Sequence, residues 1–93
     1  MLLFEWDPQK AESNFKKHSI TFDEASSVFK DTLSLTIDDP LYSRNNEERS
    51  VLIGISHKNR FLTVVHTERN EKIRIISARK STKSERRFHE SNG

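Results

Sequence analysis

The segment Lys72-Ile-Arg-Ile-Ile-Ser-Ala-Arg79 is the strongest strand signal in this chain, and the rest of the predicted fold is built around it. Its β-branched isoleucines favour extended backbone, so we expect an inner strand of a sheet. Side chains alternate across a strand, which predicts one face with residues 73, 75, 77 and 79 and another with residues 72, 74, 76 and 78. Because an unpaired guanidinium is costly to bury, Arg74 needs an acid, a phosphate or open solvent.

Two further β-rich runs, residues 49–56 and 60–68, precede this strand and are joined to it and to each other by three-residue links. Links this short connect antiparallel neighbours, so the three runs are expected to form a meander. If each three-residue link closes its hairpin symmetrically, Glu68 lies opposite Lys72 and His66 opposite Arg74, with Ser50 beyond His66 on the same face. A slip of one residue would separate His66 from Arg74.

Residues 33–37 alternate with period two and predict a fourth strand. Residues 3–6 could add a short edge strand. After the fourth strand, Asp38 and Asp39 precede Pro40, a pattern more typical of an acidic turn than of a cation site. The polar run to Glu48 is then a loop of about ten residues.

Helix start signals occur three times. Asp7 followed by Pro8 predicts a helix to about His18, with Ala11, Phe15 and His18 as its apolar stripe. Thr21 and Glu24 form a capping-box pattern, and so do Thr82 and Glu85.

The second helix is expected to end near residue 30 and to bury Phe22, Ala25, Val28 and Phe29. The fold class that follows is α+β, one domain over residues 1–93. Two N-terminal helices pack on one face of a four-stranded antiparallel sheet, and a short C-terminal helix follows.

Charge is distributed unevenly along the chain. Residues 1–48 hold five Lys and Arg against ten Asp and Glu, a net charge of −5, whereas residues 49–93 hold eleven against four, a net charge of +7. A basic second half favours a polyanionic partner, although ordinary solvated faces would give the same count. The chain has no cysteine and meets an acid at its fifth residue, so we expect a cytoplasmic protein without signal peptide or membrane span.

The sequence lacks a glycine-rich phosphate loop, a metalloprotease helix motif and a nucleophile elbow. What remains is a predicted sheet face suited to a phosphate backbone, on which a histidine or glutamate could move protons. Its members are His66, Glu68, Lys72 and Arg74, flanked by Arg49, Arg69 and Arg79.

Two segments, residues 4–18 and 73–79, followed by Thr82, Glu85 and Arg86, resemble the BrnT family of toxins. The matching positions of the first segment are Trp6, Asp7, Lys10, Asn14, Lys17 and His18. The sequence departs from the family pattern at Ser19, where glycine is usual, and at His89, where a tyrosine is expected.

The resemblance implies a ribonuclease toxin of a type II toxin–antitoxin system with a RelE-like fold, which stops translation and growth. It implies an RNA substrate and a BrnA-like antitoxin that forms an oligomer with the toxin. Cleavage would proceed without metal or other cofactor, by attack of the ribose 2′-hydroxyl on the adjacent phosphate. The expected catalytic residues are Arg74, His66, Glu68 and Arg79, and the expected RNA-binding residues are Lys10, Lys17, Arg49, Arg69 and Lys72.

Two other functions fit the residues. A basic sheet could hold RNA or DNA without reacting, or it could serve only as the surface that binds the antitoxin. Incubation of the protein with RNA and a chelator separates the three. Cleavage indicates the enzyme, retention without cleavage the binding module, and neither outcome the adaptor.

Overall fold

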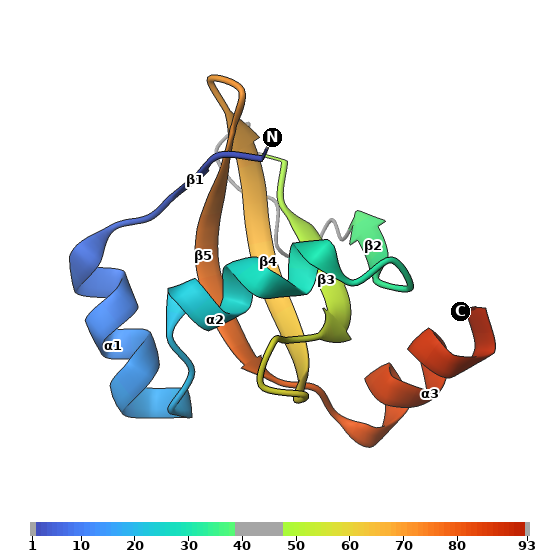
Figure 1. Ribbon diagram of the computed structural model, residues 1–93. Helices are drawn as coiled ribbons and strands as arrows, with labels where there is room; N and C mark the ends of the chain where they lie inside the picture. Colours follow the sequence, from blue (N-terminus) through green and yellow to red (C-terminus); the bar gives the residue numbers. More distant parts are fainter. Residues whose placement is uncertain (1, 39–47, 93) are drawn as a thin grey trace.

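The computed structural model describes residues 2–38 and 48–92 (Figure 1). The strands are β1 (Phe4–Glu5), β2 (Leu35–Asp38), β3 (Ser50–Ile55), β4 (Phe61–Arg69) and β5 (Lys72–Lys80). The helices are α1 (Pro8–His18), α2 (Phe22–Ser27) and α3 (Lys83–Asn92), with a 3₁₀ turn, η1 (Val28–Lys30), directly after α2. Most of the loop expected over residues 39–48, including Asp39, lies outside the described residues.

The described strands form one sheet in the order β1-β5-β4-β3-β2. β2 to β5 are antiparallel neighbours, as the short links predict. β1 instead runs parallel to β5, with Phe4 beside Ile73 and Glu5 beside Arg74. The expectation of a four-stranded antiparallel sheet is therefore wrong at this edge, where a fifth strand makes the sheet mixed. Two parallel neighbouring strands are joined by a long connection rather than by a short turn. The residues around β1 therefore do not indicate which strand it pairs with.

The predicted caps form at all three helix starts. The Asp7 carboxylate accepts a hydrogen bond from the Gln9 N–H at 2.8 Å. The Thr21 hydroxyl accepts from the Glu24 N–H at 3.0 Å. At α3 the capping box is reciprocal, because the Thr82 N–H donates to the Glu85 carboxylate at 2.7 Å while the Glu85 N–H donates to Thr82 at 3.2 Å. These bonds satisfy N–H groups that have no partner inside a helix.

Ser19 ends α1 in the left-handed conformation, with φ 59° and ψ 29°, and its N–H donates to the Phe15 carbonyl. Glycine adopts this conformation without strain from a Cβ atom, which explains why glycine is expected at this position.

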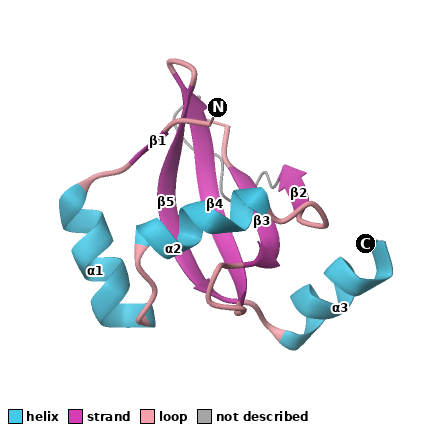
Figure 2. Ribbon diagram, in the orientation of Figure 1, coloured by secondary structure: helices cyan, strands magenta, loops and turns pink. Residues whose placement is uncertain are grey.

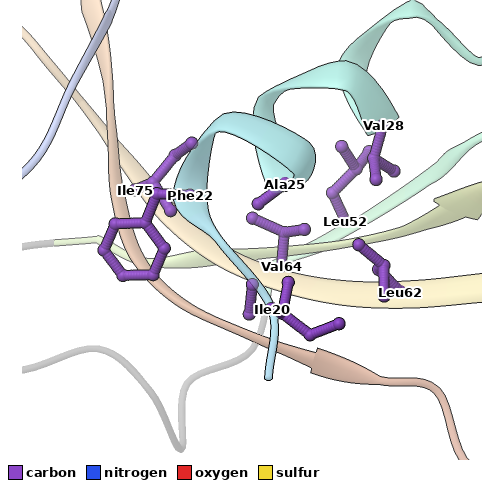
Figure 3. Close-up of a cluster of buried hydrophobic side chains, with 9 residues drawn as sticks. Ile20, Phe22, Ala25, Val28, Leu52, Leu62, Val64 and Ile75 are labelled. Atoms are coloured by element: carbon purple, nitrogen blue, oxygen red, sulfur yellow. The ribbon is translucent and has the colours of Figure 1, made fainter. Parts of the chain in front are cut away.

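The main hydrophobic core lies between the sheet and the helices α1 and α2 (Figures 2 and 3). Its buried residues are Ile20, Phe22, Ala25, Val28, Leu52, Leu62, Val64, Ile75 and Ala78. We call the side of the sheet that carries Leu52, Val64 and Ala78 the helix-covered face. The predicted burial of Phe22, Ala25 and Val28 is confirmed, and Phe29 is half-buried against the same core.

Close contact between η1 and β3 depends on Gly54. A Cβ atom there would come within 2.9 Å of the Val28 side chain, the Asp31 carboxylate and the Ser34 Cβ. No other residue type fits at that separation without a shift of its neighbours.

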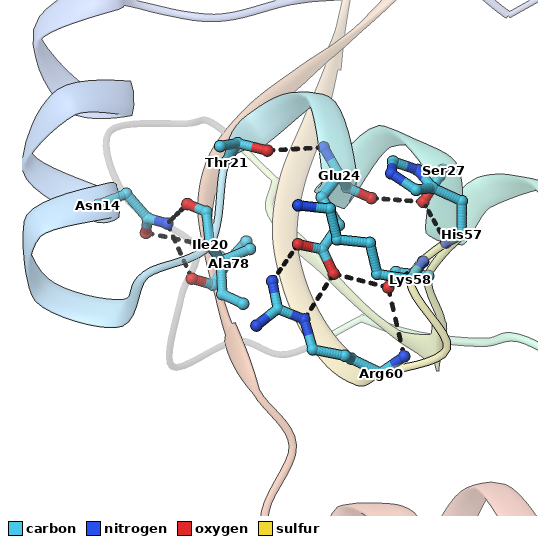
Figure 4. A network of polar contacts seen from close by, with 10 residues as sticks. Asn14, Ile20, Thr21, Glu24, Ser27, His57, Lys58, Arg60 and Ala78 are labelled. Atoms are coloured by element: carbon cyan, nitrogen blue, oxygen red, sulfur yellow. Dashed lines mark hydrogen bonds and ion pairs between the residues drawn. The ribbon is translucent and has the colours of Figure 1, made fainter.

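The apolar stripe predicted for α1 is wrong at Phe15, whose side chain is 50% exposed. The residue that α1 buries is Asn14. Its amide nitrogen donates to the carbonyls of Ile20 and Ala78 at 3.0 and 2.9 Å, and its oxygen accepts from the Ala78 N–H at 3.0 Å (Figure 4). The Asn14 amide thus bonds the backbone of β5 where β1 has already ended, as a neighbouring strand would.

A β-bulge changes the faces of β5. Val65 pairs with Ser77 and His66 with Ile75, so Ile76 is an extra residue in the ladder. The predicted alternation holds on each side of the bulge but fails across it. Ile75 and Ala78 therefore share the helix-covered face, contrary to the expectation.

The opposite side of the sheet carries a second cluster of buried residues, Val51, Ile53 and Val65, with Ile37 and Ile76 packed against them. Helix α3 lies over this side near β3, and we call it the α3 face. The bulge places both Arg74 and Arg79 on the α3 face, because Arg74 pairs with Thr67 and Arg79 with Thr63.

The turn between β4 and β5 explains why the predicted pairs are shifted. Asn70 and Glu71 both have positive φ, 52° and 65°, as in a two-residue type I′ turn. Arg69 therefore pairs with Lys72, and Glu68 with Ile73. The expected pairing of Glu68 with Lys72 assumed a three-residue link and is wrong by one position.

Candidate functional site

Polar side chains cross the α3 face near the β4–β5 turn. Glu5 of β1 lies beside Arg74 of β5, and Arg74 lies beside Thr67 of β4. Arg49 directly precedes Ser50, the partner of His66, which puts Arg49 next to Thr67. The Thr67 hydroxyl donates to the Glu48 carbonyl at 2.7 Å and so fixes the start of β3.

Arg74 occupies an inner strand with neighbours on both sides. Its Nη1 lies 3.7 Å from Oε2 of Glu5, and its side chain is 28% exposed. Two residues closer to the β4–β5 turn, the exposed pair Arg69 and Lys72 lies on the same face. We call Arg49, Arg69, Lys72 and Arg74 the basic patch. Four cations on one rigid surface suit a phosphate backbone.

Arg79 lies at the other end of the α3 face. Its two terminal nitrogens each donate to a Glu85 oxygen at 2.8 Å, a bidentate pair that ties β5 to α3. Hydrogen bonds from Arg79, opposed by partial burial and helped by the Thr82 N–H, lower the pKa of Glu85 to about 2. A groove of about 230 Å³ lies beside this pair, between α3 and the sheet. Its lining residues are Ile37, Val51, Ile53, Arg79, Ser84, Glu85 and Phe88.

His66 lies on the helix-covered face, opposite Ile75 rather than Arg74. The expected pairing of His66 with Arg74 is wrong because the turn has two residues, whereas the pairing of Ser50 with His66 is confirmed. His66 is buried, with its ring centroid 4.9 Å from that of Phe29. Burial lowers the pKa of His66 and keeps the ring neutral.

Glu68 is exposed and pairs with Ile73, which also turns it away from the side of Arg74. Lys10 and Lys17 are exposed on α1, which packs against β5 beyond the end of β1 (Figure 1). Of the predicted site residues, the structure therefore brings together Arg49, Arg69, Lys72 and Arg74. It separates them from His66 and Glu68.

A buried ion pair on the helix side of the sheet is not indicated by the sequence. Glu24 is 1% exposed, and its carboxylate accepts from Nε of Arg60 at 2.9 Å and from the Ser56 hydroxyl at 2.7 Å (Figure 4). The Arg60 hydrogen bond outweighs desolvation and lowers the pKa of Glu24. Within the helix sequence Glu24 resembles an ordinary capping-box glutamate, so no local signal distinguishes it.

His89 of α3 is also buried, with Nε2 3.5 Å from the Asp31 carboxylate and the ring 5.2 Å from that of Phe61. Burial opposes ionisation of Asp31, but hydrogen bonds from the N–H groups of Ile55 and Leu33 lower its pKa overall. His89, at the position where a tyrosine is expected, thus anchors α3 to the body of this protein.

Over residues 2–38 and 48–92, no three His, Asp or Glu side chains gather in a group that could hold a metal ion. In the same ranges, none of the helices has the length and apolarity to cross a bilayer.

A profile of the ribonuclease toxin BrnT of type II toxin–antitoxin systems matches residues 6–85. The chain belongs to the BrnT family. The 1.1 Å crystal structure of the Brucella abortus ribonuclease toxin BrnT has a similar fold, with a TM-score of 0.65 over 89% of this chain and 100% of that chain. The sequences are 16% identical, so that likeness concerns the fold alone. No curated protein sequence matches the chain.

Membership of the BrnT family identifies the chain as a ribonuclease toxin, with RNA as its substrate and an antitoxin as its partner. The interpretation as an enzyme is therefore favoured over a non-catalytic binding module or a pure adaptor. The basic patch is a described surface whose positive charge complements that of an RNA backbone.

Proposed function

We propose that this BrnT toxin cleaves RNA at the basic patch without a metal ion. RNA carries its own nucleophile, the 2′-hydroxyl next to each phosphate, so the protein must chiefly hold the phosphate and stabilise added charge. Arg74 suits this role, because neighbouring strands on both sides fix its position. That placement is the observation on which the proposal rests.

The remaining cations are proposed to bind the strand on either side of the cleaved phosphate. Arg49, Arg69 and Lys72 lie within the basic patch. Lys10 and Lys17 are exposed on α1 and would meet RNA that extends past β5. Arg79 is proposed to act near the far end of the strand, where its bond to Glu85 orients it. A role for His66 or Glu68 in proton transfer stays a prediction, and it requires RNA to reach the helix-covered face.

We further infer a RelE-like arrangement and a BrnA-like antitoxin that forms an oligomer with the toxin and blocks the basic patch. RNA cleavage would then inhibit translation and growth when the antitoxin is absent. Support comes from the family match over residues 6–85 and from the helices packed on one side of an antiparallel meander. Co-expression with the antitoxin is expected to restore growth.

The mechanism is tested by incubating the purified toxin with a short RNA in excess EDTA. We expect cleavage to continue and the 5′ fragment to end in a 2′,3′-cyclic phosphate. The same RNA with a single 2′-deoxy residue at the cut position should be resistant. A matched preparation of Arg74→Ala controls for contaminating nucleases. Loss of cleavage on chelation, restored by Mg²⁺, would remove the metal-free mechanism.

A further inference from the structure

Attack by a 2′-hydroxyl also needs a group that accepts its proton, and the basic patch itself consists of cations. The carboxylate that the structure places against Arg74 is that of Glu5. Strand β1 holds it there. The Ile73 N–H donates to the Leu3 carbonyl at 2.8 Å, and Glu5 is the direct neighbour of Arg74 in the parallel pair.

Alternation along β1 explains why Glu5 faces the same way as Arg74. Phe4 and Trp6 pack into the core of the helix-covered face, where Phe4 lies 5.1 Å from Phe29 and Trp6 lies 6.0 Å from Phe22, ring centre to ring centre. Glu5, between them, must point to the α3 face. Its side chain is 30% exposed, so solvent and substrate can reach it.

The Glu5–Arg74 contact is loose in comparison with the other arginine pairs. The separation of 3.7 Å exceeds the 2.8 Å of both Arg79–Glu85 bonds. Charge-assisted hydrogen bonds are usually about 2.7–2.9 Å long, so Glu5 and Arg74 each keep bonding capacity for another group. The carboxylates of Glu85 and Glu24, in contrast, are already engaged by Arg79 and Arg60.

We infer that Glu5 is the general base of the cleavage reaction, an inference that rests on the proposed function. Arg74 holds a phosphate oxygen, and the Glu5 carboxylate takes the proton of the neighbouring 2′-hydroxyl. The 2′-oxygen forms a bond to phosphorus while the bond from phosphorus to the 5′-oxygen breaks. A solvent water protonates the departing 5′-oxygen, and Glu5 then returns its proton to solvent.

The test compares Glu5→Gln with Glu12→Gln, in which the same charge is removed from an exposed residue of α1. Glutamine keeps the size of the side chain and can still accept a hydrogen bond from Arg74, but it is not a base. We expect Glu5→Gln to lower kcat by about 10² to 10³ while RNA binds as tightly as before or tighter. Glu12→Gln should cleave like the parent.

Rescue of Glu5→Ala by a small carboxylate distinguishes a general base from a purely structural residue. Added formate should restore part of its cleavage, because a small carboxylate can occupy the vacated space beside Arg74. The inference is overturned if Glu5→Gln cleaves within about threefold of the parent, or if its loss follows weaker RNA binding or a lower melting temperature. If instead the parent cleaves RNA only with Mg²⁺ present, the proposed function fails before Glu5 is tested.

Discussion

At the scale of single residues, the useful property of Arg74 is its fixed position. Its backbone is held between two paired strands, and its planar guanidinium can bind two phosphate oxygens at once. A lysine at the same place would supply the charge without that geometry. The acid that the structure places beside Arg74 is Glu5.

We therefore expect Arg74→Lys to keep RNA binding and to lose cleavage by about 10² to 10³. Gel-based cleavage and binding assays measure the two effects, and melting temperatures of Arg74→Lys and Arg74→Ala serve as the control for folding. If both variants melt like the parent and still arrest growth, Arg74 is neither catalytic nor structural. If both unfold early, its role is structural.

At the level of secondary-structure elements, α1 and α3 are each attached to β5 by a polar side chain. Asn14 bonds the backbone of Ala78, and Glu85 bonds Arg79. Both attachments hold the strand that carries Arg74, so they set the shape of the surface on which RNA is proposed to bind.

Asn14→Ala is expected to lower the free energy of unfolding by roughly 3 kcal/mol, because it leaves buried backbone groups of Ile20 and Ala78 without partners. Asn14→Asp should be at least as harmful, since a carboxylate would face two carbonyl oxygens. Urea unfolding measures both, with the exposed Ser13→Ala on the same helix as the control. A loss below about 0.5 kcal/mol in Asn14→Ala would contradict the role assigned to this amide.

Glu85→Gln is expected to make the stability of the protein less sensitive to acid. The pKa of Glu85 is about 2 in the folded protein and 4.5 as its ordinary value. The pair with Arg79 therefore contributes its full stability above pH 4.5 and loses it progressively as the pH falls toward 2.

Thermal melting of the parent and of Glu85→Gln across that window measures the effect. Between pH 4.5 and pH 2, the parent should lose more stability than Glu85→Gln does. The exposed residue Glu90 supplies the matched control, Glu90→Gln, which should follow the parent. Parallel pH profiles for the parent and Glu85→Gln would show that the Arg79 pair adds nothing.

At the scale of the whole molecule, the net charge of +7 on residues 49–93 belongs largely to the last two strands and α3. The basic patch gathers part of it at one end of the α3 face. Binding of a single RNA strand there should release counterions from the phosphates and so weaken with added salt.

Lys72→Gln is expected to weaken RNA binding and to reduce the slope of log Kd against log salt concentration by about 0.7, the value for one phosphate contact with a single strand. Fluorescence anisotropy at several salt concentrations measures the slope. Lys30→Gln removes the same charge from η1, on the other side of the sheet, and should leave the slope unchanged. Equal slopes for both variants would place the RNA elsewhere.

Features that depend on neighbours along the chain could be predicted from the sequence alone. Asp7, Thr21 and Thr82 mark the helix starts correctly, and short links give the antiparallel order of β3, β4 and β5. The resemblance carried by residues 4–18 and 73–79 agrees with the family that the profile identifies. Capping bonds and hairpins form between residues a few positions apart, so local sequence is sufficient to specify them.

Which side chains share a face of the sheet depends instead on contacts between distant parts of the chain. The bulge at Ile76 put Arg74 and Arg79 on the same face, and the two-residue turn put His66, which contacts Phe29, on the opposite face from Arg74. The pairing of β1 with β5 brought Glu5 to Arg74 from the far end of the chain. In a sheet, a shift of one residue reverses the face of every later side chain, and a bulge is stabilised by packing between distant strands rather than by a local sequence signal.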